Sequence, residues 1–537
     1  MTCTVSIWQG RAVFSMEDKK HKNGEKAAKT ISLMAIIILV AKAMGLVREM
    51  LVANIYGQGM ESDMINTATQ IPLLFFDMVL GVAILSTFVP VFNKRIASEG
   101  KEAAITFANN FATIVGLIAT LVAVLGIVFA EPLVGLMVPG YGVVAGKIEQ
   151  TAMLLRILFP SIAFTAMAYV AVGILQSFGE FTIPSLISVV SNGVMILYLI
   201  IFKDRLGLVG VAVSMLIAWI LQLVIQIPYL KKFGYRYKFR ADIKDSGIKE
   251  AALIALPVLI SSWVQPLCNV INMSFGSGLG DGAVSALGWA NKIYIIMVGV
   301  FAYAITNFIF PKLSRLSSDE CADEFSESTR TSIGYTVFII TLVCALFIAL
   351  SQPIISLVFE RGAFTSEAAK ITGEALFYYS FGMIGYAICE VLNKSFYALS
   401  DGKTPMITSI IGIIVNFISA ALLVGVFKMG VGGLALAGAI SSVTIAVCLM
   451  IMINKRRSGV VTSAFLINAV KTLLCGVIAF GVARAVDVFA VKFGGGTVMT
   501  FLRLCVCSVP AVVVYFGFSY ILGVWEMRVA VNKFLNK

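Results

Sequence analysis

The sequence predicts an all-α polytopic membrane protein with about 14 transmembrane helices, arranged as two parallel six-helix repeats plus two extra C-terminal helices. Of its 537 residues, 59% are hydrophobic and only 13% are charged, which is about half the charge of a soluble protein. Continuous apolar runs recur along the chain, each long enough to cross about 30 Å of hydrocarbon. Residue pairs at the ends of these runs repeat at one fixed offset, which indicates an internal duplication.

The spans are predicted from the apolar runs in chain order. Each run is bounded by charged residues, glycine or proline, as the ends of membrane helices are. The predicted spans are 31–55, 65–92, 104–130, 149–178, 183–202, 207–230, 250–275, 283–310, 330–352, 371–398, 405–427, 432–453, 462–484 and 498–523.

The distribution of Lys and Arg predicts the topology. Alternate loops carry about 26 basic residues on one side and about 8 on the other. The positive-inside rule places the richer set in the cytoplasm, so both termini are predicted to be cytoplasmic. The net charge of +12 is therefore explained by topology, without a nucleic-acid partner.

Three residue pairs define the repeat: Pro90 and Pro311, Leu136 and Leu357, and Pro184 and Pro405 are each 221 positions apart. Parallel repeats of six helices favour a transporter that works by alternating access over a duplicated static channel. The predicted parts are a cytoplasmic tail (1–30), an N-lobe (31–233), a basic linker (234–248), a C-lobe (249–455), two further helices (456–525) and a cytoplasmic tail (526–537). Either Met1 or Met16 starts the chain.

Lys42, Arg48 and Lys292 lie inside predicted spans. A charge at the helix centre costs roughly 2.5–3.5 kcal/mol on insertion scales, so such residues face a protein interior or a water-filled cavity. Three cations with few matching anions favour a cavity for an anionic passenger. The alternative is that each cation is paired locally or extends to a lipid headgroup.

Diphosphate is the natural ligand for such a cluster, because both Arg and Lys bind phosphate oxygens. An amphiphile with a diphosphate headgroup would leave its tail in the bilayer or in a groove. Glu49 is expected to orient Arg48 or a cation on another helix, because it is too far along the helix to pair with Lys42. Ser285 and Asn291 accompany Lys292 on the eighth span.

Other polar residues within the spans have open roles. Asp77, Glu390 and Glu374 either pair with Arg156 or the central cations, or bind a coupling ion. Arg156 precedes Pro160, where a kink would open the helix. Asn269, Asn272 and Asn416 either contribute to a Na⁺ site or pack between helices. No cofactor is predicted, and no metal site is assigned, because the chain has one histidine and no CxxC pair. Coupling to the membrane potential, Na⁺ or H⁺ is open.

Four stretches resemble the MurJ (MviN) family of lipid II flippases in the MOP exporter superfamily. They are AKAMGLVREMLVANIYGQGMESD at 41–63, FVPVF at 88–92, FERGAF at 359–364 and FYALSDGKTP at 396–405. The resemblance implies a MATE-like, V-shaped pair of six-helix lobes with a cationic central cavity. It also implies that the last two helices form a groove for a lipid tail.

The resemblance implies that several residues of this chain belong to the substrate-binding site. Lys42 and Arg48 match basic cavity residues, Glu49 is their acidic neighbour, and Asp63 matches an acidic residue in the loop before the second helix. Ser285 and Lys292 match the serine and arginine of the eighth helix, and Asn291 replaces an aspartate. Phe76 and Asp77 stand where the best-known branch has two arginines.

The leading hypothesis is a transporter, not an enzyme, that moves lipid II to the outer leaflet for peptidoglycan synthesis, cell-wall biogenesis and cell shape. Lipid II is undecaprenyl-diphosphate-linked MurNAc-pentapeptide-GlcNAc. Its expected partners are this substrate, membrane lipids and the cell-wall synthesis machinery. One alternative is a flippase for another polyprenyl-diphosphate-linked oligosaccharide. Another is a membrane glycosyltransferase that uses a lipid-diphosphate donor.

Overall fold

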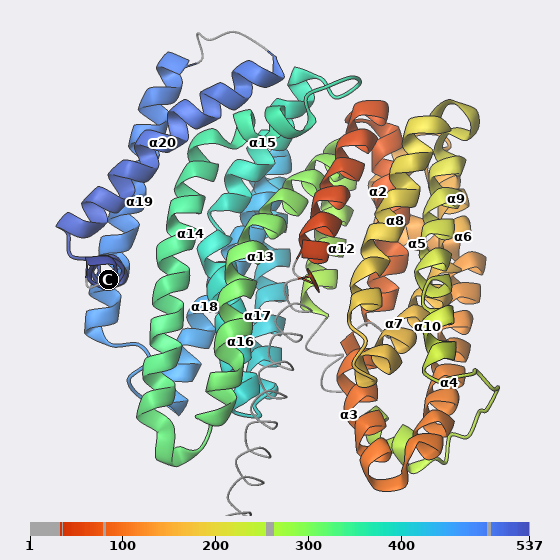
Figure 1. Cartoon of the computed structure of the whole chain (residues 1–537). Helices are drawn as coiled ribbons and strands as arrows, with labels where there is room; N and C mark the ends of the chain where they lie inside the picture. The colour runs from red at the N-terminus through yellow and green to blue at the C-terminus, as the bar shows by residue number, and fades with distance from the viewer. Residues whose placement is uncertain (1–32, 35, 79–81, 254–262, 491–495, 536–537) are drawn as a thin grey trace, which may run out of the picture. The chain divides into compact units, whose positions relative to one another are not determined.

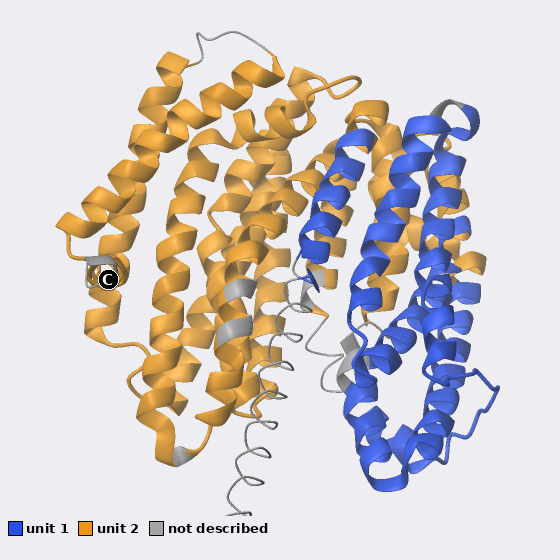
Figure 2. Cartoon of the chain, in the orientation of Figure 1, with its two compact units in different colours: residues 1–51, 83–125, 157–255 blue, residues 52–82, 126–156, 256–537 orange. Residues whose placement is uncertain are grey.

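A computed structural model describes residues 33–34, 36–78, 82–253, 263–490 and 496–535 as helices and short connections, with no strand among them. The predicted tail 1–30, the choice between Met1 and Met16, and the middle of the predicted span 250–275 lie outside these residues. The chain forms two compact units (Figure 2). Unit 1 contains Met1–Leu51, Ala83–Leu125 and Ile157–Ala255. Unit 2 contains Val52–Val82, Gly126–Arg156 and Leu256–Lys537.

The helices follow one another along the chain with short turns between them (Figure 1). The first helix covers 36–56. It is followed by α2 (Met60–Phe76), α3 (Val82–Glu99), α4 (Lys101–Val128), α5 (Ala130–Met137), η2 (Pro139–Val143), α6 (Lys147–Leu158), α7 (Ser161–Ser177), α8 (Thr182–Ile201), α9 (Lys203–Val224), α10 (Ile227–Lys232), α12 (Val264–Ser277), α13 (Ala283–Arg315), η3 (Asp319–Cys321), α14 (Ala322–Phe359), α15 (Ser366–Ser380), α16 (Met383–Ala398), α17 (Lys403–Ala420), η4 (Ala421–Val426), α18 (Gly430–Arg456), α19 (Ser463–Ala490), α20 (Thr497–Ile521) and α21 (Trp525–Leu535).

The prediction of an all-α polytopic membrane protein is confirmed. Among the described residues, 10 helices are long and apolar enough to cross a membrane, or up to 11 if one bent pair counts as a span. The count of fourteen stays a prediction, because several predicted spans are broken in the structure or include residues outside the described ranges. The predicted span 65–92, for example, contains both α2 and α3.

Two predicted spans are interrupted in the structure, and one of the interruptions has a local cause. The helix expected at 149–178 breaks at Pro160, which separates α6 from α7, because proline lacks the N–H that would continue the helix. The helix expected at 371–398 is a pair, α15 and α16, bent by 49° at a short break. The predicted turns 359–367 and 397–405 lie at the two ends of this pair.

Small residues let α16 pack closely on α18 in unit 2. A Cβ atom added to Gly382 would lie 2.7 Å from Ala439 Cα, and one added to Gly385 would lie 2.8 Å from Val443 N. Membrane helices associate through such close contacts, because lipid provides no hydrophobic drive between them. The buried side chains of α13, α14, α16 and α18 form a continuous apolar core around Phe396 and Leu449.

Two helices that the predicted repeat relates begin in the same way. Glu180 Oε1 accepts N–H bonds from Thr182 (2.9 Å) and Ile183 (3.3 Å) at the start of α8. Asp401 Oδ1 accepts N–H bonds from Lys403 (3.1 Å) and Thr404 (3.0 Å) at the start of α17. The two carboxylates are related by the predicted 221-residue offset, so equivalent residues begin equivalent helices.

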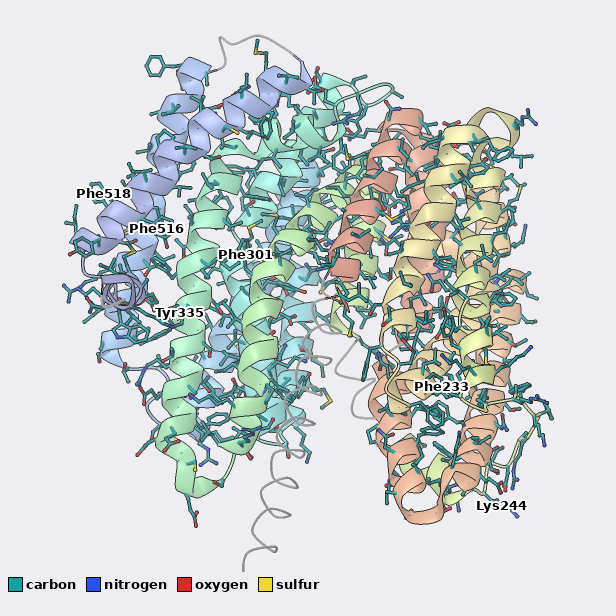
Figure 3. The ribbon with its side chains drawn as sticks, viewed as in Figure 1. Phe233, Lys244, Phe301, Tyr335, Phe516 and Phe518 are labelled. Atoms are coloured by element: carbon teal, nitrogen blue, oxygen red, sulfur yellow. The ribbon has the colours of Figure 1, made fainter. Side chains whose placement is uncertain are left out.

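The C-terminal tail expected at 526–537 begins as a helix, α21, that packs on α19 in unit 2. Glu526 Oε2 accepts a hydrogen bond from Asn468 Nδ2 (2.7 Å), and Glu526 is buried. Figure 3 shows the aromatic side chains of α20 beside this region, with Phe516 and Phe518 labelled.

Candidate functional site

A buried carboxylate joins α2 to the start of α13 in unit 2. Asp63 Oδ1 accepts the Ser285 N–H (2.8 Å), and Asp63 Oδ2 accepts the Gly282 N–H (2.8 Å). Gly282 is the N-cap of α13, so the carboxylate lies at the positive end of that helix. The expectation that Asp63 lies in a loop is wrong: it lies in the first turn of α2 and is fully buried, because the helix starts at Met60.

Lys147, the first residue of α6, completes this site. Its Nζ lies 3.2 Å from Asp63 Oδ2 and 2.7 Å from Asp281 Oδ1, and its side chain is 2% exposed. The ammonium also lies 4.0 Å from the centre of the Tyr141 ring. One buried cation thus pairs with two carboxylates: Asp63 in the interior, and Asp281 at the surface, where its side chain is 46% exposed.

The surrounding polar groups are also paired. The Ser62 hydroxyl lies 3.1 Å from the Ser285 hydroxyl, and Gln58 Nε2 donates to Gly282 O (3.1 Å). The Tyr141 hydroxyl lies 2.8 Å from Thr67 Oγ1. Burial, with the nearby negative charge of Asp63, raises the pKa of Tyr141, so it acts as a neutral hydrogen-bonding group. We call Asp63, Lys147, Asp281 and Ser285 the buried ion cluster.

Lys147 is a central member of this site that was not expected from the sequence. Nothing in its local sequence distinguishes it from an exposed loop lysine, and its partners are distant in sequence. Contact of Asp63 and Ser285 with substrate stays a prediction, since this structure buries both in the cluster.

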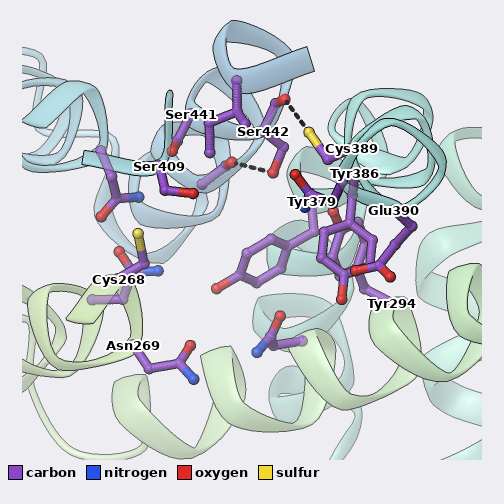
Figure 4. A pocket seen from close by; sticks show the side chains of 16 residues that line it. Cys268, Asn269, Tyr294, Tyr379, Tyr386, Cys389, Glu390, Ser409, Ser441 and Ser442 are labelled. Atoms are coloured by element: carbon purple, nitrogen blue, oxygen red, sulfur yellow. Dashed lines mark hydrogen bonds between the residues drawn. The ribbon is translucent and has the colours of Figure 1, made fainter. Parts of the chain in front are cut away.

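A polar cavity of about 250 Å³ lies among α12, α13 and α15–α18 of unit 2 (Figure 4). Its walls carry one carboxylate, Glu390, together with tyrosine, serine and asparagine side chains. The predicted residues in its lining are Asn269, Asn272, Asn291, Glu390 and Asn416. Buried oxygens of Asn272 and Asn416 have no hydrogen-bond partner there. Oxygen groups of this kind suit a hard cation or a polar headgroup.

Lys292 lines a smaller cavity beside the first. Its volume is about 50 Å³, and its walls include Asn66, Gln70 and Lys292. Asn269, Asn272, Asn291 and Tyr379 line both cavities, so the structure places Lys292 and Asn291 on one polar wall with Glu390 close by. The predicted association of Lys292 with Asn291 is therefore present within unit 2.

Lys42, Arg48 and Glu49 belong to unit 1. Arg48 Nη2 lies 2.6 Å from Glu49 Oε1, which agrees with the expectation that Glu49 orients Arg48. Lys42 is exposed and has no ion-pair partner within the part of the chain that is described. Asn192 Nδ2 donates to Ala41 O (3.2 Å) and lies against Gly45, so the glycine allows α8 to approach the first helix.

Arg156 and the acidic residues Asp77, Glu374 and Glu390 do not pair with one another in the way that the sequence suggested. Arg156 Nη2 lies 3.7 Å from Glu131 Oε2 on α5, and no ion pair joins it to Asp77, Glu374 or Glu390 among the described residues. Asp77 is exposed and lines a third cavity of about 150 Å³ with Gln70 and Asn269. Glu131 on α5, which was not among the expected partners, is therefore the carboxylate that pairs with Arg156 in this structure.

Comparison with known structures defines the class of the fold. The chain is similar to a structure titled "Lipid II flippase MurJ, inward closed conformation", with a TM-score of 0.76, 24% identity, and coverage of 91% of this chain and 98% of that one. It is also similar to an inward-facing MATE family multidrug resistance transporter of the MOP superfamily, with a TM-score of 0.63, 16% identity, and coverage of 80% and 98%. The fold is therefore that of the helical MOP transporters.

Sequence comparison identifies the family. The model described as "Lipid II flippase MurJ" matches residues 52–528. A probable lipid II flippase MurJ of Bdellovibrio bacteriovorus is 26% identical over 511 residues, which cover 94% of this chain and 96% of the relative. One of Rickettsia prowazekii is 28% identical over 388 residues, which cover 72% and 76%. The chain belongs to the MurJ family of lipid II flippases, which confirms the expectation of a transporter rather than an enzyme.

Proposed function

We propose that this protein moves lipid II from the inner to the outer leaflet of the bacterial cytoplasmic membrane, with both termini in the cytoplasm. The observation that carries the proposal is the match of most of the chain to the lipid II flippase family. The undecaprenyl chain stays in lipid while the diphosphate and its sugars cross through the protein. The other polyprenyl-diphosphate oligosaccharides and the glycosyltransferase reaction are not favoured by these comparisons.

The diphosphate is held by Lys42, Arg48 and Lys292. Arg48 is pre-oriented by Glu49, whereas Lys42 presents an exposed ammonium. Lys292 lies on the polar wall described above, where Asn291 and Gln70 supply hydrogen-bonding groups. Basic side chains at a site of reduced dielectric attract phosphate strongly and specify its position.

The buried ion cluster closes the outer side of the protein. It ties α2 and α6, from the first repeat, to the start of α13, from the second, through the buried charges of Asp63 and Lys147. Opening the outer side requires these contacts to separate and to be hydrated. Binding of the headgroup would offset that cost. A second contribution would come from binding of Na⁺ or H⁺, or from the membrane potential. Glu390 is the candidate carboxylate for a coupling cation.

Depletion of the protein in its native bacterium tests this function. The expected result is accumulation of lipid II in the inner leaflet, arrested peptidoglycan synthesis, and loss of cell shape. An assay that labels or cleaves only lipid II exposed on the outer leaflet distinguishes failed translocation from failed synthesis. Lipid II that reaches the outer leaflet at the normal rate after depletion would refute the proposal.

A further inference from the structure

A short segment of unit 1 alternates aromatic and basic residues: Tyr235-Arg236-Tyr237-Lys238-Phe239-Arg240. It follows α10 and has neither helix nor strand structure. Figure 3 labels Phe233 just before the segment and Lys244 just after it. We propose that this segment binds the surface of an anionic lipid bilayer.

The segment is held firmly against α4. The N–H of Lys238 donates to Asn109 Oδ1 (3.1 Å), and the N–H of Arg240 donates to Thr113 Oγ1 (3.2 Å). Asp242 exchanges two hydrogen bonds with the side chain of Asn110, each of 2.7 Å. These three polar residues of α4 are buried beneath the segment. Backbone groups of Lys238, Arg240 and Asp242 are thus bonded to α4, which fixes the path of the segment along that helix.

The apolar side chains of the segment face outward. Tyr237 is 50% exposed, Phe239 is 72% exposed, and Ile243, just beyond, is 73% exposed. Tyr235, by contrast, is buried and anchors the segment. Exposed aromatic side chains close together are costly in water and typical of the boundary between lipid and water.

The charge of this region matches a phosphate-bearing surface. Residues 231–245 contain six basic and two acidic side chains. Asp245 is neutralised by Arg95 at 2.7 Å, and Asp242 lies 3.9 Å from Arg240. Arg236, Lys238 and Lys244 are exposed, and the inner leaflet carries anionic lipids that attract such clusters.

The position of the segment fits the entry of α4 into the membrane. Thr113 bonds to the segment through both Arg240 and Tyr237. One turn further, on the same face of α4, Leu117 is exposed and begins a lipid-facing apolar stripe that includes Leu121. Thr113, which Tyr237 contacts, lies roughly 6 Å along the helix axis before that stripe, so the proposal places Tyr237 at the level where headgroups meet hydrocarbon.

Chymotrypsin tests the inference, because it cleaves after Tyr237 and Phe239. The full-length protein is placed in nanodiscs of phosphatidylcholine alone or with added phosphatidylglycerol, and cleavage in this segment is followed by mass spectrometry. We expect phosphatidylglycerol to slow cleavage by at least about fivefold, the factor that corresponds to one interfacial charge. The assay is independent of transport and of the side on which the segment lies.

Two triple variants make the test specific. The first variant combines Arg236→Gln, Lys238→Gln and Arg240→Gln. It should abolish the slowing of cleavage by phosphatidylglycerol, and it leaves the chymotrypsin sites intact. The second variant combines Lys312→Gln, Arg315→Gln and Lys455→Gln, which removes the same number of exposed charges elsewhere. This control variant should still be cleaved more slowly when phosphatidylglycerol is present. Equal cleavage of the unaltered protein in both membranes would overturn the proposal, and would favour a soluble partner for the segment. Equal protection of both triple variants would also overturn it.

Discussion

Lys147 Nζ lies 3.2 Å from Asp63 Oδ2, and neither side chain is reached by water. The ammonium also pairs with Asp281 at 2.7 Å, so one buried lysine serves two carboxylates. Burying such charges is costly unless each is paired, which makes the cluster sensitive to the loss of any member.

Lys147→Ala is expected to lower the free energy of unfolding by about 3–5 kcal/mol, because it leaves Asp63 buried without its cation. Thermal unfolding in detergent measures this loss. Lys94→Ala is the matched control, since Lys94 pairs with Glu250 at 2.8 Å but is 66% exposed, and it should change the stability by less than about 1 kcal/mol. Similar losses in the two variants would show that the cluster is not a closed, buried site.

A disulfide between Ser62→Cys and Ser285→Cys should hold the outer side closed. The two hydroxyl oxygens are 3.1 Å apart in this structure, close enough for cysteines to pair. Oxidation is expected to stop lipid II translocation, and a reductant should restore it. The two single-cysteine variants control for the loss of the hydroxyls. Normal translocation with the disulfide fully formed would contradict separation of α2 from α13 during transport.

Arg48→Ala should abolish complementation of a depleted strain while the protein still inserts into the membrane. The arginine has a local partner in Glu49, which orients it, so Glu49→Gln should weaken function less than Arg48→Ala does. Arg205→Ala removes an exposed arginine of the same unit and should be neutral. Growth supported by a normally expressed Arg48→Ala protein would remove Arg48 from the substrate site.

Lys292→Arg should support growth and Lys292→Glu should not. Either basic group neutralises diphosphate, whereas a carboxylate repels it in a site of reduced dielectric. Lys292→Gln isolates the effect of losing the charge alone and should fall between them. If the Glu variant is as active as the Arg variant in the same strain, the substrate does not contact this wall.

Gly385→Ala should destabilise the packing of α16 on α18, since the added Cβ would lie 2.8 Å from Val443 N. A loss of about 1–3 kcal/mol is expected from such overpacking, seen as a lower unfolding temperature in detergent. Gly517→Ala is the control, because no atom lies within 4 Å of its added Cβ on α20. Equal stability of the two variants would mean that this interface adapts without cost.

The membrane class, most of the span positions and the turns at both ends of the α15–α16 pair could be predicted from sequence, because lipid imposes long apolar helices bounded by polar turns. The break between α6 and α7 could also be predicted, because Pro160 signals it. The partners of Lys147 and Arg156 could not be predicted. Asp281 is 134 positions away from Lys147, and Glu131 is 25 positions away from Arg156. Nothing local in a sequence encodes such pairing. The polar wall that joins Lys292 to Asn291 was predictable in part, because adjacent polar residues on one apolar helix stand out.

The carboxylates of Glu180 and Asp401 reach backbone groups only two and three positions ahead of them. Contacts this local need no other part of the protein, so each can form as soon as its own turn leaves the ribosome. Spans enter a bilayer one after another, and the depth at which each stops is fixed before later partners exist. The starts of α8 and α17 can therefore be fixed early in synthesis, before the helices that pack on them have been made.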